Sequence, residues 1–298
     1  MCYSVKVMID LHTHSTASDG TFTPRELVEY AKNKGITVLA LTDHDTTSGL
    51  EEAEEAARKN GIIFVPGIEI NVQWPTGEFH LLGLGLKETG EKLSSIISFQ
   101  KEERLNRNIQ MAKKLQEAGL DISFEEVKER FNTENVGRPH FAQYMLEKKL
   151  IKNRQVAFDK YFAKGRPCFV DRCGADLEES IEAITLSGGI PVIAHPLSLY
   201  VSWGKMDDTI KIIKDKGVVG LEAWHPGSRH GEAVRLEELA HRMGMFATAG
   251  SDFHGEKVRS DRHIGYTAGN RRIEEKFYYE ELLPNLEKYR QNHPLIKD

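Results

Sequence analysis

The chain has 298 residues, a length that allows one large domain or one domain with a modest insertion. Hydrophobic residues make up 40% and charged residues 29% of the chain, which excludes disordered, collagen-like and disulfide-stapled classes. The formal net charge is −5, and no apolar run approaches the ~18 residues of a membrane span. Residues 1–10 lack the long apolar segment of a secretory signal. Three cysteines, Cys2, Cys168 and Cys173, show no CxxC pairing, so we expect a reduced, cytoplasmic protein.

The first hundred residues alternate between strand and helix patterns. Two helices are predicted by capping boxes, in which a Ser or Thr N-cap precedes a Glu by three residues: Thr23 with Glu26, and Ser48 with Glu51. Pro24 opens the first helix, and the two helices are expected to end near Gly35 and Gly61. The predicted strands are Val5–Leu11, Ile36–Leu41, Ile62–Ile70 and Phe79–Leu86. This alternation predicts βαβ units and a mainly parallel sheet.

The pattern changes between residues 99 and 168, where the sequence is helical and charged. This segment carries 15 Lys and Arg against 10 Asp and Glu, a formal charge of +5, whereas the remaining residues carry −10. A basic insert on an acidic body could steer an anionic substrate, or the surface charge could simply be uneven. We therefore predict a barrel formed by residues 1–98 and 169–298, with a small helical insert at 99–168 that covers the active site.

The strand and helix alternation resumes after the insert. Asp176 and Glu179 predict the start of a helix. The strands predicted in this part are Ile190–Ala194, Val218–Ala223, Met245–Ala249 and Ile264–Thr267.

Metal-binding residue types collect at the ends of the predicted strands. His12 and His14 follow the first strand, and because side chains alternate along a strand they point the same way and could chelate one ion. Taken alone, this pair could equally be two surface or core histidines. At least five strands, however, carry His, Asp or Glu at the same relative place, the carboxyl end, and in a parallel barrel all these ends lie on the face that holds the active site. The candidate ligands are His12, His14, Asp19, His44, Glu69, His80, His195, Asp252 and His254.

The types of side chain in this set restrict which metal ions the site could bind. Imidazole and carboxylate without thiolate suit Zn²⁺, Mn²⁺ or Fe²⁺ rather than Ca²⁺ or an iron–sulfur cluster. Nine ligands, at three or four per ion with positions left open for water and substrate, imply two or three ions.

The order of these motifs resembles the polymerase and histidinol phosphatase (PHP) family of metal-dependent phosphoesterases. The motifs are His12-Thr13-His14-Ser15 with Asp19-Gly20, Thr42-Asp43-His44-Asp45, Gly67-Ile68-Glu69-Ile70, Ala194-His195-Pro196 and Gly250-Ser251-Asp252-Phe253-His254. The resemblance implies an α/β fold, a distorted seven-stranded β/α (TIM-like) barrel with a trinuclear metal site. It assigns His12, His14, Glu69 and Asp252 to one ion, Glu69, His80 and His195 to a second, and Asp19, His44 and His254 to a third.

A positively charged metal site of this kind suits a phosphate ester. Bound metals depress the pKa of water, so a hydroxide that bridges two ions is the expected nucleophile, and the ions would hold phosphate oxygens in the transition state. Asp10, Asp43 and Asp45 could support ligand histidines or could bind loop backbone; we favour the first role for Asp10 and leave the other two open.

The insert contains the run Gly137-Arg138-Pro139-His140-Phe141-Ala142. Pro139 fits the first position of a helix, so Arg138 and His140 would flank a helix N-terminus, where anions bind. The alternative is a capped surface helix with an exposed arginine. The hexapeptide resembles a signature of the PHP subgroup that acts on nucleoside 3′,5′-bisphosphates and on the 5′ ends of short RNA, which implies a phosphate clamp.

The segment Trp224 to His230 follows another predicted strand. His225 could contact the substrate phosphate or orient a metal ligand, which places it with Arg138 and His140 as a candidate catalytic residue. Trp224 could stack on a base, although core packing explains it slightly better.

The function expected from the resemblance is hydrolysis of the 3′-phosphate of nucleoside 3′,5′-bisphosphates, with 5′–3′ exonuclease activity on short RNA as a second activity. The alternatives are a PHP phosphatase for another small phosphomonoester, such as histidinol phosphate, and a non-catalytic interaction module. The expected partner is a small phosphorylated substrate, a nucleotide or a short RNA 5′ end, and we expect no membrane and no obligate protein partner.

Overall fold

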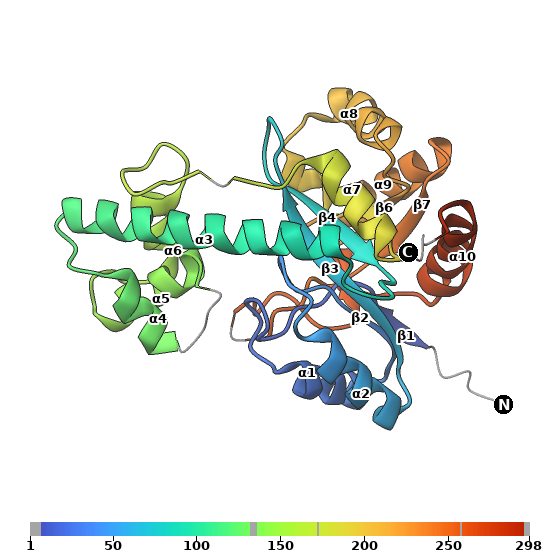
Figure 1. The fold of residues 1–298 in the computed structure, drawn as a ribbon, viewed down its shortest axis with the longest axis horizontal. Coiled ribbons are helices and arrows are strands. Elements are labelled where there is room, and N and C mark those ends of the chain that lie inside the picture. The colour runs from blue at the N-terminus through green and yellow to red at the C-terminus, as the bar shows by residue number, and fades with distance from the viewer. Residues whose placement is uncertain (1–6, 132–135, 172, 257, 295–298) are drawn as a thin grey trace. The chain divides into compact units, whose positions relative to one another are not determined.

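A computed structural model describes residues 7–131, 136–171, 173–256 and 258–294 (Figure 1). The chain divides into two compact units, one formed by residues 1–97 and 175–298 and the other by residues 98–174. Each unit has buried hydrophobic clusters of its own. Among the described residues, no helix combines the length and the apolar composition that crossing a membrane requires.

The first unit is built on a seven-stranded sheet whose strands pair in chain order, β1 to β7. The strands are β1 Met8–Asp10, β2 Ile36–Leu41, β3 Ile63–Val72, β4 Phe79–Leu84, β5 Ile190–Ile193, β6 Gly220–Trp224 and β7 Phe246–Ala249. Strand β4 is antiparallel to both of its neighbours, and every other pair is parallel. The short connection between β3 and β4 explains this reversal, because a parallel crossover needs a dozen or more residues. The mainly parallel sheet predicted from the sequence is confirmed.

The sheet curls until its first and last strands meet. Just beyond β1, Leu11 N donates to Ala249 O (3.3 Å) and His14 N donates to Phe253 O (2.9 Å). In the opposite direction, Asp252 N donates to His12 O (2.9 Å). These backbone hydrogen bonds join the carboxyl ends of β1 and β7, so the predicted distorted seven-stranded barrel is confirmed.

Most of the predicted strands differ from the structure by one or two residues at an end, and the first and the last differ more. The first was expected from Val5, which lies outside the described residues. The last, Ile264–Thr267, contributes only β8 (Tyr266–Thr267), which pairs with β9 (Arg271–Arg272) in a separate two-stranded sheet. A tight turn between them, with left-handed backbone at Gly269 and Asn270, makes this segment a hairpin and keeps it out of the barrel sheet.

Helices pack around the sheet of the first unit, and α1 and α2 lie side by side in Figure 1. These helices are α1 Pro24–Asn33, α2 Leu50–Asn60, α7 Leu177–Leu186, α8 Trp203–Asp215, α9 His230–Arg242 and α10 Leu283–Asn292. The capping box of α1 is confirmed, since Thr23 Oγ1 accepts from Glu26 N (3.2 Å) and Glu26 Oε2 accepts from Thr23 N (2.9 Å). Asp176 caps α7 in the same way that the sequence predicted.

The second predicted capping box is wrong. Helix α2 begins at Leu50 after Gly49, and no side chain caps it. Ser48 instead forms two hydrogen bonds with Thr46 in the preceding loop. Its N–H donates to Thr46 Oγ1 (3.2 Å), and its hydroxyl accepts from the same hydroxyl group (3.1 Å). A local side-chain turn therefore competes with the cap.

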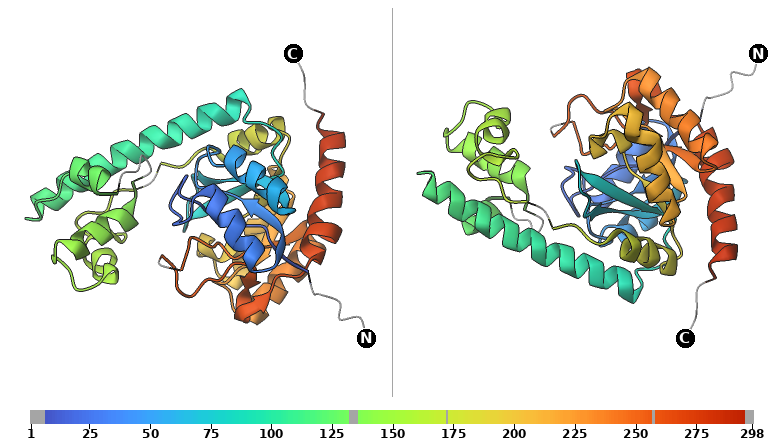
Figure 2. Two further views of the ribbon diagram at one scale, coloured as in Figure 1. Left: turned by 90° about the horizontal axis from the view of Figure 1, so that it is seen from below. Right: turned by 90° about the horizontal axis from the view of Figure 1, so that it is seen from above.

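The second unit is helical, as the sequence predicted. Its helices are the distal part of α3 (Glu91–Glu117), α4 Phe124–Phe131, α5 Arg138–Glu147 and α6 Arg154–Ala157. Figure 2 shows α4 and α5 gathered against the far end of α3. Met111 and Leu115 of α3 pack there in one buried cluster with Phe124, Phe141 and Met145.

Candidate metal centre

The candidate ligands come from the strands of the barrel and from the loops that follow them. His12 and His14 follow β1, His44 follows β2, His195 follows β5, and Asp252 and His254 follow β7, while Glu69 and His80 lie within β3 and β4. Backbone geometry is unusual at two of these positions, because non-glycine residues His195 and Asp252 have positive φ angles of 24° and 49°. Such conformations cost energy and persist only where the surroundings hold them, which is typical of functional sites.

Glu69 is the buried centre of the cluster. Its two oxygens approach five imidazole rings: Oε2 lies 3.0–3.3 Å from nitrogens of His12, His14 and His44, and Oε1 lies 2.8–2.9 Å from nitrogens of His80 and His195. Burial alone would raise the pKa of Glu69, but the neighbouring His44 and His12 hold it well below its usual range. An ionised carboxylate with both oxygens surrounded by nitrogen donors has the geometry of a bridging metal ligand.

The first group of donor atoms comprises His12, His14, Glu69 and Asp252, whose ligand atoms all lie within 4.8 Å of one another. Asp252 Oδ1 lies 3.1 Å from His14 Nε2 and 3.6 Å from His12 Nε2. Across the described residues, the buried atoms His12 Nε2, His14 Nε2 and Glu69 Oε2 have no hydrogen-bond partner. Buried polar atoms almost always have a partner, so a cation that accepts these three donors fits the group.

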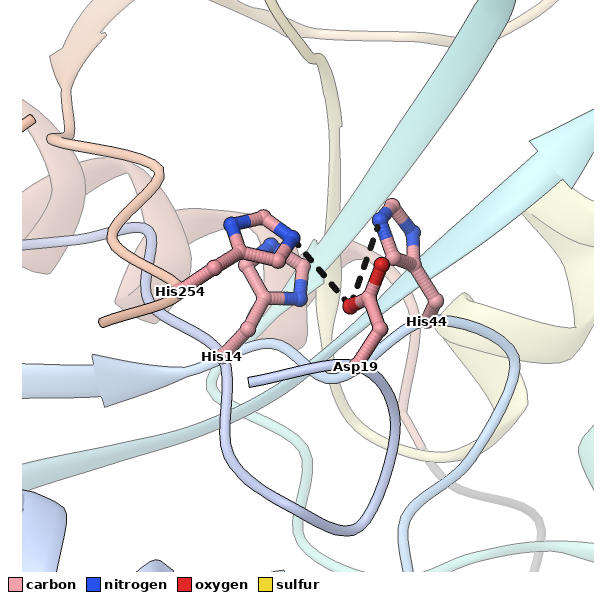
Figure 3. Close-up of side chains that lie close together, drawn as sticks. All are labelled: His14, Asp19, His44 and His254. Carbon is pink, nitrogen blue, oxygen red and sulfur yellow. Dashed lines mark ion pairs between the residues drawn. The ribbon is translucent and has the colours of Figure 1, made fainter. Parts of the chain in front are cut away.

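A second group comprises His14, Asp19, His44 and His254 (Figure 3). Asp19 Oδ1 lies 3.2 Å from His254 Nε2 and 4.0 Å from His44 Nε2. The His14 and His254 rings stack with their centroids 4.0 Å apart. Burial would raise the pKa of Asp19, but His254 and His44 hold it well below its usual range. This carboxylate is therefore ionised and available to a cation.

A third group comprises His44, Glu69 and His80. His195 lies beside it, with its ring centroid 5.1 Å from that of His80 and its Nε2 atom on Glu69 Oε1. The structure thus brings eight of the nine candidate ligands together in three overlapping groups, of which Glu69 belongs to two, and the ninth, His195, contacts Glu69 directly.

Protons compete with metal at these histidines. Burial would lower the pKa of His12, but the charges of Glu222, Glu69 and Asp252 raise it well above its usual value. For His14, the neighbouring carboxylates of Asp252 and Glu69 overcome burial and raise the pKa to about 10. Cation binding at these nitrogens would therefore release protons.

Glu222 is a residue of the site that the sequence analysis missed. It lies in β6, where its Oε1 atom is 2.9 Å from His12 Nδ1 and its Oε2 atom accepts from His195 N (2.8 Å). The contact fixes the proton of His12 on Nδ1 and leaves Nε2 to face the first group. A charged residue inside the apolar run Val218–Ala223 was the signal that could have revealed it.

Three further carboxylates bind the backbone of the ligand loops. Buried Asp10 accepts from the N–H groups of His12 (3.3 Å), Ser251 (2.9 Å) and Gly265 (2.7 Å), and burial raises its pKa to about 6. It contacts no ligand imidazole, so it supports His12 through the main chain.

Asp43 and Asp45 act on neighbouring loops. Asp43 accepts from Ser15 N (2.8 Å) and from the hydroxyls of Ser15 (2.6 Å) and Ser18 (2.5 Å). Asp45 accepts from Asn71 N (3.0 Å). Both carboxylates therefore bind backbone N–H groups, Asp43 in the loop after β1 and Asp45 in strand β3, which is one of the two roles that the sequence left open.

The candidate catalytic residues lie in different units. His225 is buried in the first unit, where its Nε2 atom is 3.3 Å from Asp252 Oδ2. In the second unit, Arg138 donates to Val170 O (2.9 Å), and His140 Nδ1 accepts from Gly137 N (3.0 Å). Helix α5 begins at Arg138, so Pro139 is its second residue rather than its first.

Trp224 is half-buried and packs on the core of the first unit. Its Nε1 atom donates to Glu237 Oε2 (2.5 Å). Both observations favour the packing role over base stacking.

The comparisons with other sequences agree with this site. Residues 10–164 match the PHP domain family. The chain is 36% identical over 245 residues to a 5′-3′ exoribonuclease of Haemophilus influenzae, covering 82% of this chain and 89% of the relative. It is 34% identical over 260 residues to a 3′,5′-nucleoside bisphosphate phosphatase of Chromobacterium violaceum, covering 87% and 91%.

Solved structures agree as well. An amidohydrolase of Chromobacterium violaceum, solved with bound sulfate and no metal, superposes with a TM-score of 0.82 at 32% identity over 95% of this chain and 97% of that one. A Bifidobacterium adolescentis protein named as a metal-dependent phosphoesterase superposes with a TM-score of 0.80 at 29% identity. The match covers 92% of this chain and 95% of that one. The chain therefore belongs to the PHP family of metal-dependent phosphoesterases, enzymes that hydrolyse phosphoester bonds.

Proposed function

We propose that this enzyme removes the 3′-phosphate from nucleoside 3′,5′-bisphosphates and also shortens RNA from its 5′ end. The observation that carries a phosphoesterase activity is the gathering of nine His, Asp and Glu donors around Glu69, with buried donor atoms left unsatisfied. The nucleotide substrate is supported by the names of the two relatives, each aligned over more than four-fifths of the chain. The cytoplasmic location expected from the sequence belongs to the same proposal and is supported by the free thiols of Cys168 and Cys173.

We propose that the donors hold two or three divalent ions, Zn²⁺, Mn²⁺ or Fe²⁺. One ion is bound by His12, His14, Glu69 and Asp252, a second by Glu69, His80 and His195, and a third by Asp19, His44 and His254. The first ion's ligands coincide with one donor group, and the third ion's ligands lie together in another, which also contains His14. The remaining group joins Glu69 and His80 to His44, and His195 reaches the second ion's set through Glu69 Oε1. The position of Glu69 in two groups supports its bridging role.

When bound, the ions supply an activated water at neutral pH and positive charge for the phosphate oxygens. The chain's own residues set the geometry. Glu222 orients His12 through its contact with His12 Nδ1. Asp10 binds backbone N–H groups in the loops after β1 and β7. His225 lies against Asp252, a position from which it orients that carboxylate and faces the phosphate that the site would bind.

Arg138 and His140 hold the non-scissile 5′-phosphate in this proposal. Both residues lie in the first turn of α5, which has no acidic residue and where the helix dipole favours anions. His140 Nδ1 already accepts from Gly137 N, so a contact with phosphate would use Nε2. The positive charge of the insert supports binding of an anion.

The test is phosphate release by the full chain, with Mn²⁺ added, across four substrate classes. These are nucleoside 3′,5′-bisphosphates, nucleoside monophosphates, histidinol phosphate and 5′-phosphorylated oligoribonucleotides. We expect the highest kcat/KM on a 3′,5′-bisphosphate and stepwise shortening of the oligoribonucleotides from the 5′ end.

Two outcomes would contradict the proposal in different ways. Preference for histidinol phosphate or another simple monoester would keep the phosphoesterase and replace its substrate. Protein that binds no divalent metal and releases no phosphate from any substrate would restore the non-catalytic interaction module.

A further inference from the structure

Arg262 is a buried arginine on an exposed loop. It is 5% exposed, whereas its neighbours Asp261 and His263 are both exposed to solvent. Burying a guanidinium is costly unless the charge is paired, so its position needs a partner. The described residues of the loop supply no carboxylate to its guanidinium, and the partner comes from the metal-binding motif.

That partner is Asp252, and the two oxygens of its carboxylate have different neighbours. Arg262 Nη1 forms an ion pair with Asp252 Oδ2 and lies 3.5 Å from Asp252 O. The other oxygen, Oδ1, faces the nitrogens of His14 (3.1 Å), His254 (3.4 Å) and His12 (3.6 Å). One oxygen is therefore held on the protein side and the other points at the candidate metal position.

His225 also contacts Oδ2, the oxygen of Asp252 that Arg262 holds. Its Nδ1 atom accepts from Gly227 N (3.0 Å), which leaves the ring proton on Nε2. Nε2 lies 3.3 Å from Asp252 Oδ2 and 3.0 Å from Arg262 Nη1. Two donors thus converge on Oδ2.

We propose that Arg262 is a positioning residue that holds Oδ2 of Asp252 and so makes this carboxylate a one-oxygen metal ligand. The inference rests on the metal role proposed for Asp252. Without Arg262 the carboxylate could rotate, and Oδ2 would lose its charged partner, so Oδ1 would no longer be fixed towards His12 and His14. Residues that orient a ligand in this way typically account for 10–100-fold in metal affinity or activity.

The experiment measures metal binding by the purified full chain in the absence of substrate. Arg262→Ala should weaken Mn²⁺ binding at one site by about 10–100-fold in a calorimetric titration, and should lower metal content after dialysis. Arg262→Lys keeps the charge but offers a compact point donor, and should recover part of the affinity. Arg259→Ala is the matched control, because Arg259 is an exposed arginine of the same loop, and should bind Mn²⁺ as the parent does.

A purely structural anchor would behave differently. If Arg262 only ties down the loop, Arg262→Ala should lower the melting temperature of metal-free protein while Mn²⁺ affinity and stoichiometry stay at parent values, and that result would overturn the proposal. If Arg262→Ala does not fold, parent-like Mn²⁺ affinity in both Arg262→Lys and Arg262→Gln would overturn it equally. Failure of the substrate panel would refute the proposed function alone, since the metal titration contains no substrate.

Discussion

The carboxylates of the site make two kinds of contact: some face the imidazole rings of the candidate ligands, and others bind the loops that carry those rings. Glu69, Asp19 and Asp252 face imidazole nitrogens, whereas Asp10 and Asp43 accept from N–H and O–H groups of the loops that carry those imidazoles. This division keeps negative charge where a cation would bind and uses the remaining charge to fix the ligand loops. Removing a carboxylate of the first kind should therefore affect metal binding and turnover more than folding.

Asp252→Ala tests this at the residue scale. We expect turnover to fall below detection because the side chain is a proposed metal ligand. The chain should still fold, but with lower stability, because buried Arg262 loses its ion-pair partner. Phosphate release and far-UV circular dichroism check the two halves of the expectation. Asp261→Ala, at an exposed position of the following loop, should keep parent activity. Activity of Asp252→Ala within about tenfold of the parent, or ~1.4 kcal/mol in the barrier, would contradict the ligand assignment.

Sequence reasoning reached the ligands more readily than the residues that orient them. His12, His14 and Asp252 follow strands, where parallel barrels collect their functional groups. Glu222 lies inside a strand and contacts His12, far away in the chain, and Arg262 lies in a polar loop that folds back on Asp252. Such partners follow from the curvature of the sheet, which local sequence patterns do not specify.

At the scale of single elements, turn chemistry decides where helices begin. Helices α1 and α2 follow the same Ser/Thr-x-x-Glu pattern, yet only Thr23 caps its helix, because Ser48 is held by Thr46. The antiparallel direction of β4 has a similar local origin in its short connection to β3. The hydrophobic periodicity predicted these helices and strands. It could not predict which side chain would cap a helix or in which direction a strand would pair.

The two Ser/Thr positions give a matched pair of stability variants. Thr23→Ala should lower the free energy of unfolding by about 1 kcal/mol, since it removes the acceptor for Glu26 N and breaks the capping box. Ser48→Ala should change it by less than about 0.5 kcal/mol, as expected of an exposed position without a cap. Urea denaturation followed by circular dichroism measures both, and equal losses would show that Ser48 caps α2 in solution.

The N-terminus of α5 gives a test of the proposed phosphate clamp. Arg138→Ala should lower kcat/KM for a nucleoside 3′,5′-bisphosphate by roughly 10²-fold, as expected from losing a charge-assisted contact of ~1.5–3 kcal/mol. The same variant should hardly affect an aryl phosphate, which has no second phosphate to hold. Arg166→Ala, an exposed arginine of the same unit, controls for the loss of one positive charge.

The comparison between the two substrates decides the role of Arg138. An equal loss on both would place Arg138 at the reacting phosphate. No loss on either would make it a structural residue, consistent with its hydrogen bond to Val170 O and its position 5.3 Å over the Phe169 ring.

For the whole molecule, the candidate metal centre joins distant parts of the chain. His12 and His14 follow the first strand, Glu69 lies in the third, and Asp252 and His254 follow the last. Backbone hydrogen bonds already connect the ends of β1 and β7, but the buried donor atoms of His12, His14 and Glu69 remain unsatisfied. A cation bound there would cross-link the barrel at its closure, so metal binding and stability of the first unit should be coupled.

Metal removal tests this coupling. Protein treated with a chelator should unfold at a lower urea concentration than protein supplied with Mn²⁺, because a ligand that binds only the folded state stabilises it, by about 2.7 kcal/mol at 100 times its Kd. Asp252→Ala, which lacks one proposed ligand, should show a smaller difference between the two conditions. The control Asp261→Ala should show the full difference, since its side chain lies outside the three donor groups. Identical urea midpoints with and without Mn²⁺ in the parent would mean that the donor groups close the barrel without a cation, and the first group would then be a hydrogen-bonded and ionic cluster rather than a metal site.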